Sequence, residues 1–260
     1  MFFKKIKIIL QIFLNKLGYK IVKKNNLEDS IPIEALTHEV NLIKKAKNYS
    51  MTDYKNLYLS AQAIKYISEN NIDGDIVECG VWKGGHIIIF KSLCEKYELS
   101  KKIFAFDTFE GMTVSTEADL NYNEEKACDL LNKVVITKND GDNIWCYASL
   151  DSVKNNITNS TGNIANINFI KGDVCETLKE TSNLPEKISL LRLDTDFYES
   201  TKIELQTLYP LLQEGGLLII DDYGHWKGAK KAVDEYFSKH YHFKHVINGT
   251  CRMIIKKNKL

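Results

Sequence analysis

Short apolar runs alternate with longer amphipathic segments along most of this chain, and no other feature constrains the fold as much. Apolar runs that end in Gly or Asp are typical of buried β-strands, whereas apolar residues spaced three and four apart are typical of helices. Strand patterns occupy residues 75–79, 102–106, 167–170, 188–193, 216–220, 243–247 and 253–256. The alternation predicts an α/β fold with a doubly wound, mostly parallel sheet and an antiparallel hairpin at its edge.

Helical patterns precede the first strand pattern and separate the others. Two helices are expected within residues 34–70, with a polar break at 48–52, where Ser50 or Thr52 can cap the second helix. Further helical patterns lie at residues 86–97, 152–159, 200–209 and 227–240. Residues 113–147 are polar and irregular, and we interpret them as an insertion or a lid, because long structureless loops are uncommon unless they are functional.

The N-terminal segment, residues 1–30, differs from residues 31–260, which we interpret as one domain that begins with a helical lid segment at 31–72. Lysines interrupt the apolar residues of 1–24, so no stretch is long enough to span a membrane, and no signal-peptide cleavage site follows. Such a basic amphipathic helix could lie on the inner membrane face, or could pack on the domain or on a second subunit. We expect a homo-oligomer.

Composition excludes several classes of partner and site. A net charge of +1 gives no electrostatic case for nucleic acid. The basic residues are nearly all lysine, with Arg192 and Arg252 as the arginines. The six cysteines are scattered without a C-x-x-C pair, which indicates neither a zinc site nor a disulfide framework. Free thiols are typical of the reducing cytoplasm, where we expect this protein.

Two acidic clusters each follow a strand pattern directly: Asp194 with Asp196, and Asp221 with Asp222. The strand ends of an open parallel sheet face one crevice, where ligands bind. Four carboxylates gathered there would repel one another unless a cation or a shared proton compensates. The clusters therefore predict a divalent metal site, and aspartate oxygens suit Mg²⁺ better than Zn²⁺.

A glycine-rich loop, residues 78–85, follows the first strand pattern. Glycine there permits a tight turn and lets a ligand approach the backbone, and the next helix offers its N-terminus. The spacing Gly-x-x-x-Gly-Gly differs from the dinucleotide pattern Gly-x-Gly-x-x-Gly. Asp107 ends the second strand pattern, where an acidic side chain can accept hydrogen bonds from a ribose. Together the two features predict a nucleotide-type cofactor.

Four motifs in sequence order resemble those of the macrocin O-methyltransferase (TylF-like) family. They are DIVECGVWKGG at 75–85, FDTFEGM at 106–112, LRLDTDFYES at 191–200 and IIDDYG at 219–224. The resemblance spans about residues 49–237 and leaves 1–30 and 113–145 unmatched. It implies a class I S-adenosylmethionine-dependent methyltransferase with a seven-stranded Rossmann-like sheet, helices on both faces, and activity on sugar hydroxyls, typically with Mg²⁺.

The resemblance also implies roles for individual residues. The positions matched to cofactor contacts are Tyr49, Ser50, Glu78, Gly80, Gly84, Asp107, Asp173 and Asp194. Among them, the glycine loop would hold the methionine part, Asp107 the ribose, and Asp173 would lie near the adenine. The positions matched to metal ligands are Asp194, Asp221 and Asp222. Asp196 matches the general base.

The residues themselves leave the identity of the base open. Asp196 could point the same way as Asp194, because alternate residues of a strand share a face. His225 follows the second acidic cluster by three residues, and histidine is the commonest general base near neutral pH.

The leading hypothesis is an S-adenosylmethionine- and Mg²⁺-dependent O-methyltransferase that acts on a sugar, a glycosylated small molecule or a nucleotide sugar. One alternative is a non-catalytic, S-adenosylmethionine-binding scaffold in a glycan pathway. A second alternative, an NAD-dependent oxidoreductase, fits the sheet but not the glycine spacing or the paired acids.

Overall fold

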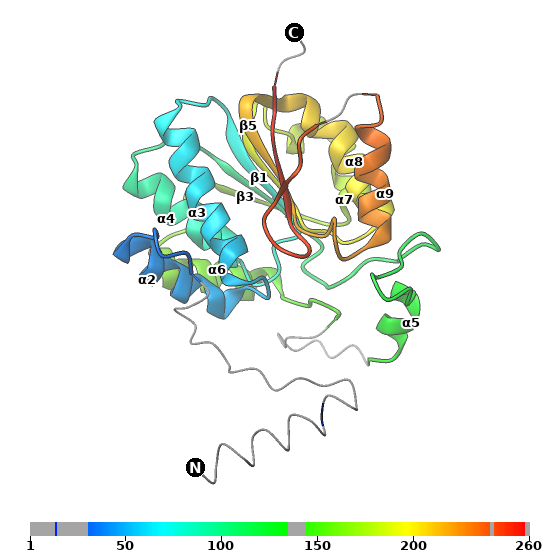
Figure 1. The fold of residues 1–260 in the computed structure, drawn as a ribbon. Coiled ribbons are helices and arrows are strands. Elements are labelled where there is room, and N and C mark those ends of the chain that lie inside the picture. Colours follow the sequence, from blue (N-terminus) through cyan, green and yellow to red (C-terminus); the bar gives the residue numbers. More distant parts are fainter. Residues whose placement is uncertain (1–13, 15–30, 135–143, 240–241, 258–260) are drawn as a thin grey trace, which may run out of the picture.

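The computed structural model describes residues 14, 31–134, 144–239 and 242–257, and Figure 1 shows them arranged around one central sheet. The strands of this described part are β1 (Asp75–Cys79), β2 (Ile103–Asp107), β3 (Ile167–Lys171), β4 (Ile188–Leu193), β5 (Leu212–Ile220), β6 (His245–Val246) and β7 (Arg252–Ile255). They form one seven-stranded sheet in the order β3-β2-β1-β4-β5-β7-β6. β1 to β5 pair in parallel, whereas β7 is antiparallel to β5 and β6. The predicted α/β class, parallel sheet and antiparallel edge hairpin are confirmed.

Helices cover both faces of the sheet (Figure 1). One face carries α2 (Thr37–Ala46), α3 (Tyr54–Glu69), α4 (Gly85–Lys96) and α6 (Leu150–Thr161), the other carries α7 (Val174–Thr177), α8 (Tyr198–Thr207) and α9 (Lys227–Tyr236), and α5 (Ala127–Asn132) lies to one side. Side chains alternate between the faces of a strand. In β5, Leu217 and Ile219 join the first core, and Leu218 and Ile220 join the second. Burial on both faces explains why the strands read as continuous apolar runs.

Helix α3 is capped by Asp53, not by Ser50 or Thr52 as the sequence suggested. The Asp53 carboxylate accepts the backbone N–H groups of Lys55 and Asn56, each at 2.9 Å. A cap must directly precede the first helical residue to reach these donors, and Asp53 holds that position. The hydroxyls of Ser50 and Thr52 instead bond to each other at 2.8 Å.

The stretch interpreted as an insertion or lid, residues 113–147, is anchored at its described start. Asp119 is fully buried there, and its carboxylate accepts the backbone N–H of Tyr198 at 2.7 Å. Asn121 forms a β-bridge with Trp226. This part of the stretch therefore docks onto the beginnings of α8 and α9, beside the carboxyl ends of the parallel strands.

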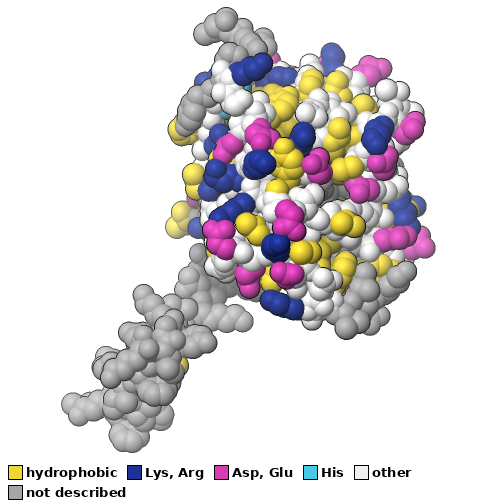
Figure 2. Space-filling model, turned by 90° about the vertical axis from the view of Figure 1, so that its right-hand side faces the viewer, with side chains coloured by type: hydrophobic (Ala, Val, Ile, Leu, Met, Phe, Trp, Pro, Cys, Tyr) yellow, Lys and Arg dark blue, Asp and Glu magenta, His cyan; other side chains and the backbone are white. Residues whose placement is uncertain are grey.

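The expectations for residues 1–24 fall outside the described residues, so contact with a membrane or a second subunit stays a prediction. The boundary at residue 30 and the assembly state likewise stay predictions. Among the described residues, no helix is both long enough and apolar enough to cross a bilayer. Acidic and basic side chains are interspersed on the face that Figure 2 shows, which agrees with a net charge of +1.

Candidate active site

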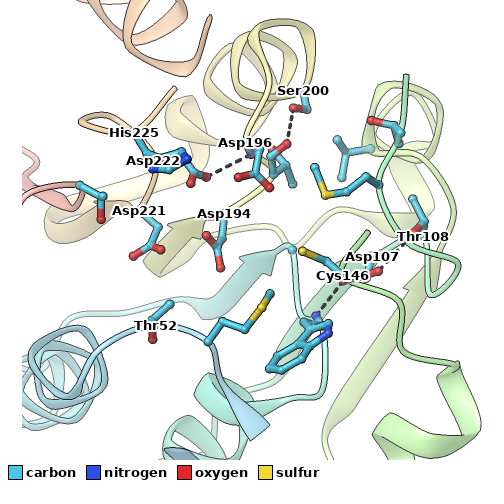
Figure 3. A pocket seen from close by; sticks show the side chains of 18 of the residues that line it. Thr52, Asp107, Thr108, Cys146, Asp194, Asp196, Ser200, Asp221, Asp222 and His225 are labelled. Atoms are coloured by element: carbon cyan, nitrogen blue, oxygen red, sulfur yellow. Dashed lines mark hydrogen bonds between the residues drawn. The ribbon is translucent and has the colours of Figure 1, made fainter. Parts of the chain in front are cut away.

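A cavity of about 600 Å³ lies at the carboxyl ends of the parallel strands. The described residues that line it include no lysine or arginine but seven aspartates: Asp53, Asp107, Asp173, Asp194, Asp196, Asp221 and Asp222. Figure 3 shows both acidic clusters, which follow the neighbouring strands β4 and β5, turned toward the same space. Ends of adjacent parallel strands meet at one edge of a sheet. The topology therefore concentrates negative charge at this edge.

The tightest group of acids consists of Asp194, Asp221 and Asp222. Each offers one carboxylate oxygen, and these oxygens lie within 4.8 Å of one another. The sheet places them together because Leu193 pairs with Ile220, and the N–H of Asp221 continues the ladder by donating to the Leu193 carbonyl at 3.0 Å. The side chains that follow β4 and β5 are thus brought side by side.

This group carries more negative charge than its surroundings compensate. Burial, followed by the charges of neighbouring aspartates, raises the pKa values of Asp221 and Asp222 well above their ordinary range. A divalent cation would remove that penalty, and hard cations such as Mg²⁺ prefer carboxylate oxygens. The residues present therefore fit a Mg²⁺ ion.

A buried arginine lies beneath the acidic group. Arg192 is 1% exposed, and its Nη1 donates to Glu78 Oε1 and to Asp194 Oδ2, both at 2.8 Å. Its Nη2 lies 3.6 Å from Asp221 Oδ1. Burial raises the pKa of Glu78 to about 8, although the Arg192 charge opposes this shift. One guanidinium orients these carboxylates without neutralising the whole group.

The fourth carboxylate of the clusters, Asp196, contacts Asp222 but lies outside the group of three carboxylates whose oxygens are within 4.8 Å of one another. Because β4 ends at Leu193, the alternation of side chains along a strand does not set the direction of the Asp196 side chain. That direction is set by the backbone of Asp196, whose φ of 68° lies in the left-handed region. Its N–H donates to Asp222 Oδ2 at 3.0 Å, and its Oδ1 accepts the indole N–H of Trp226 at 2.6 Å. Burial and the charge of Asp194 raise the pKa of Asp196 to about 7. This carboxyl group is therefore suited to exchanging a proton near neutral pH.

His225 lines the same cavity from the loop between β5 and α9. Its backbone N–H donates to the Asp222 carbonyl at 2.9 Å, and its ring meets the Tyr122 ring edge-on at a centroid distance of 5.3 Å. Partial burial lowers the pKa of His225, which favours neutral imidazole at pH 7. A neutral imidazole can accept a proton, so both His225 and Asp196 remain candidates for the general base.

The glycine loop approaches the acidic group closely. Gly80 has a φ of 84°, and a Cβ there would lie 2.0 Å from the backbone oxygen of Asp194, so this position requires glycine. Asp107 Oδ2 accepts the N–H groups of Val81 and Trp82 at 2.7 and 2.9 Å. Asp107 also lines the cavity, so it both fixes the loop and borders the space that a cofactor would fill.

Other positions matched to cofactor contacts lie behind the cavity lining. These are Tyr49, Ser50, Glu78 and Gly84. Tyr49 and Ser50 pack against the glycine loop, since a Cβ on Gly85 would lie 2.7 Å from the Tyr49 carbonyl oxygen and the Ser50 Cβ. The next residues, Met51 and Thr52, reach the cavity in their place. Asp173 does line the cavity, and it also caps α7.

The sequence profile of the macrocin-O-methyltransferase (TylF) family matches residues 6–248. The chain belongs to this family. It is therefore an S-adenosylmethionine-dependent O-methyltransferase, as the four motifs implied.

This TylF-family chain is similar to several named O-methyltransferases. Demethyldecarbamoylnovobiocin O-methyltransferase from Streptomyces niveus is 30% identical over 195 residues, which are 75% of this chain and 70% of that protein. Mycinamicin III 3''-O-methyltransferase from Micromonospora griseorubida is 25% identical over 223 residues, 82% and 83% of the two chains. The solved structure of the O-methyltransferase NovP covers 81% of this chain and 83% of its own, with a TM-score of 0.70 and 27% identity. The Rossmann-like methyltransferase fold is thus shared.

Three residues of this TylF-family site were not assigned a role from the sequence. Arg192 holds Asp194, Trp226 holds Asp196, and Asn56 donates to Asp221 Oδ1 at 2.5 Å. An isolated arginine within a buried apolar strand signals a partner, because a charge is rarely buried unpaired. Nothing in the sequence around Trp226 or Asn56 indicated a role, because their partners, Asp196 and Asp221, lie far away along the chain.

Proposed function

We propose that this TylF-family enzyme methylates a hydroxyl group of a sugar or glycosylated small molecule, with Mg²⁺ at the acidic group. The observation that carries the proposal is the convergence, in one cavity, of the glycine loop, three clustered aspartates and a fourth carboxylate with a pKa of about 7. S-Adenosylmethionine supplies an electrophilic methyl group to the acceptor oxygen. The names of the relatives, which include a mycinamicin III 3''-O-methyltransferase, support an acceptor that carries a sugar.

The proposed metal ligands are Asp194, Asp221 and Asp222. Mg²⁺ bound there would lower the pKa of the acceptor hydroxyl and fix its position. Arg192 orients Asp194, and the N–H of Asp196 orients Asp222. Methyl transfer is an in-line displacement, so the rate depends on how accurately these residues hold the reacting atoms.

Asp196 is the proposed general base. Trp226 occupies its Oδ1, which leaves Oδ2 to take the proton from the acceptor hydroxyl as the new bond between oxygen and the methyl carbon forms. A pKa of about 7 suits this transfer at neutral pH. His225 is the competing base, because its neutral imidazole borders the same cavity.

The cofactor is proposed to bind at the glycine-loop end of the cavity. Gly80 would let the methionine part approach the backbone, and Asp107 and Asp173 border the space proposed for the ribose and the adenine. Tyr49 and Ser50 would act indirectly, by holding Met51 and Thr52 in the cavity lining.

The charge of the lining suggests which acceptors the cavity favours. Its described residues contribute seven aspartates and no lysine or arginine. Even together with Arg192, the two charges of Mg²⁺ and the single sulfonium charge of the cofactor do not balance seven aspartates when these are ionised. An acceptor with a diphosphate would therefore meet a repulsive potential. We propose that a neutral glycosylated acceptor is preferred over a nucleotide sugar.

A methyl-transfer assay with isotopically labelled S-adenosylmethionine tests the proposal. The acceptor panel should pair neutral glycosides with nucleotide sugars of the same monosaccharides, each with and without Mg²⁺. We expect Mg²⁺-dependent labelling of a glycoside hydroxyl. Absence of S-adenosylmethionine binding in calorimetry would overturn the proposal. Binding without transfer to any acceptor would favour the second candidate, a non-catalytic scaffold.

A further inference from the structure

A pair of asparagine side chains connects one proposed metal ligand to a turn near the end of the described chain. Asn56, in the first turn of α3, is 3% exposed. Its Nδ2 donates to Asp221 Oδ1 at 2.5 Å, and its Oδ1 accepts from Asn248 Nδ2 at 2.6 Å. Asn248 stands in the turn between β6 and β7, and that turn lines the cavity with Gly249 and Thr250.

Chemistry fixes the direction of both amides. The backbone N–H groups that Asn248 Oδ1 accepts can only donate, so Asn56 must present its oxygen to Asn248 and its NH₂ group to Asp221. Asn248 must then present its own NH₂ group to Asn56. Its Oδ1 faces donors on the other side, the N–H groups of Thr250 at 2.9 Å and Cys251 at 2.7 Å. A flip of either amide would set oxygen against oxygen or N–H against N–H.

The turn itself is held in place. The N–H of Gly224 donates to the Thr250 carbonyl at 2.8 Å, and a Cβ on Gly224 would lie 2.0 Å from the Gly249 oxygen. Asn248 Nδ2 also donates to Asp53 Oδ2 at 3.0 Å, which ties the turn to the start of α3. The β6–β7 turn, the start of α3 and the loop after β5 therefore meet around Asn56.

We propose that Asn56 is a positioning residue for the metal site, and that it makes the orientation of Asp221 depend on the β6–β7 turn through Asn248. This inference rests on the proposed metal site. Residues that orient a ligand in this way commonly contribute about 10- to 100-fold to metal affinity. Because coupling between sites is reciprocal, any change that an acceptor on the turn causes in metal affinity is matched by an equal change that the metal causes in acceptor affinity.

The test measures Mn²⁺ affinity by electron paramagnetic resonance on the full-length protein without acceptor. Asn56→Ala should weaken Mn²⁺ binding about tenfold or more. Asn248→Ala should weaken it in the same direction, although Asn248 touches no proposed ligand. S-Adenosylmethionine affinity measured without metal should stay unchanged in both variants. The matched control is Asn70→Ala at the other end of α3, where the amide bonds only to the Tyr66 carbonyl at 2.9 Å.

The outcomes separate this inference from the proposed function. If wild type binds Mn²⁺ and Asn56→Ala binds it equally well, Asn56 does not position the site. If Asn56→Ala does not fold, Asn248→Ala decides, and wild-type affinity in that variant overturns the inference. If wild type binds no Mn²⁺, or if Asp221→Asn binds it as tightly as wild type does, the proposed metal site itself is wrong.

Discussion

The two ends of the cavity are organised in different ways. At the glycine-loop end, the Asp107 carboxylate accepts the backbone N–H groups of Val81, Trp82 and Phe109 at 2.7 to 2.9 Å. At the acidic end, Asp221 and Asp222 face other carboxylates, and burial and repulsion raise their pKa values. Buried polar groups are stable when they are paired and costly when they are not. The glycine-loop end is therefore preformed, whereas the acidic end would be completed by the cation proposed to bind there.

The largest expected effect comes from removing the cation that we propose for the acidic end. Treatment with a chelator, or Asp221→Asn, should lower kcat by about 100-fold or more, since a metal ion contributes several kcal/mol to transition-state stabilisation. Calorimetry should show unchanged S-adenosylmethionine affinity, because the preformed end stays intact. A loss of S-adenosylmethionine affinity along with the loss of kcat would show that the glycine-loop end depends on the acidic end for its structure.

The next largest effect separates the two candidate bases. Asp196→Asn preserves side-chain shape and tolerates the left-handed backbone, so it should lower kcat by about 100-fold through loss of proton transfer. His225→Gln is the matched variant and should lower kcat less. Steady-state kinetics at saturating Mg²⁺ distinguishes them. A larger effect at His225, with Mn²⁺ binding retained in both variants, would assign the base to histidine.

The effect expected at the preformed end should appear in stability. Asp107→Ala removes the acceptor for three buried N–H groups, so urea unfolding should show a loss of about 3 kcal/mol, the lower end of a cost of about 1–3 kcal/mol for each unsatisfied group. Mn²⁺ affinity should be unchanged. A variant as stable as wild type would show that these N–H groups find other partners.

The last effect is a change of stability with pH, and it concerns Glu204, a buried carboxyl beneath the acidic end. Burial raises its pKa to about 8, and its Oε1 accepts the Thr195 hydroxyl at 2.9 Å. Since the folded-state pKa lies above the unfolded one, the folded protein holds this proton more tightly, and stability falls as pH rises from about 4.5 to about 8. The slope from this group reaches about 1.4 kcal/mol per pH unit.

Glu204→Gln should remove that slope. Urea unfolding of both proteins at a series of pH values should give a stability difference that favours the variant increasingly toward pH 8. Added Mg²⁺ should reduce this difference only slightly, because burial, and not the charge of Asp194, is the main cause of the raised pKa of Glu204. A difference that disappears with Mg²⁺ would place Glu204 within reach of the cation.

Much of this architecture could be predicted from local sequence. Apolar runs marked the strands, and Asp194 and Asp221 follow two of them directly, so sheet topology alone brings these acids together. Asp196 was harder, because it lies beyond the strand in a left-handed turn. Motif matching named Tyr49 and Ser50, yet the cavity is lined by the residues after them. Contacts that close only in three dimensions, such as Asn56 to Asn248, leave no local pattern.

The place of β7 in the sheet has a consequence for synthesis of the protein. β7 pairs with β5, and the turn before it supplies the cavity lining at Asn248 and Thr250. A ribosome delivers these residues after every other strand of the sheet has been made. A nascent chain that ends just after the second acidic cluster would contain both clusters, but β5 would be an unpaired edge strand of the sheet. The cavity is complete only when the β6–β7 hairpin has emerged, so a premature stop codon before this hairpin would remove part of the cavity lining.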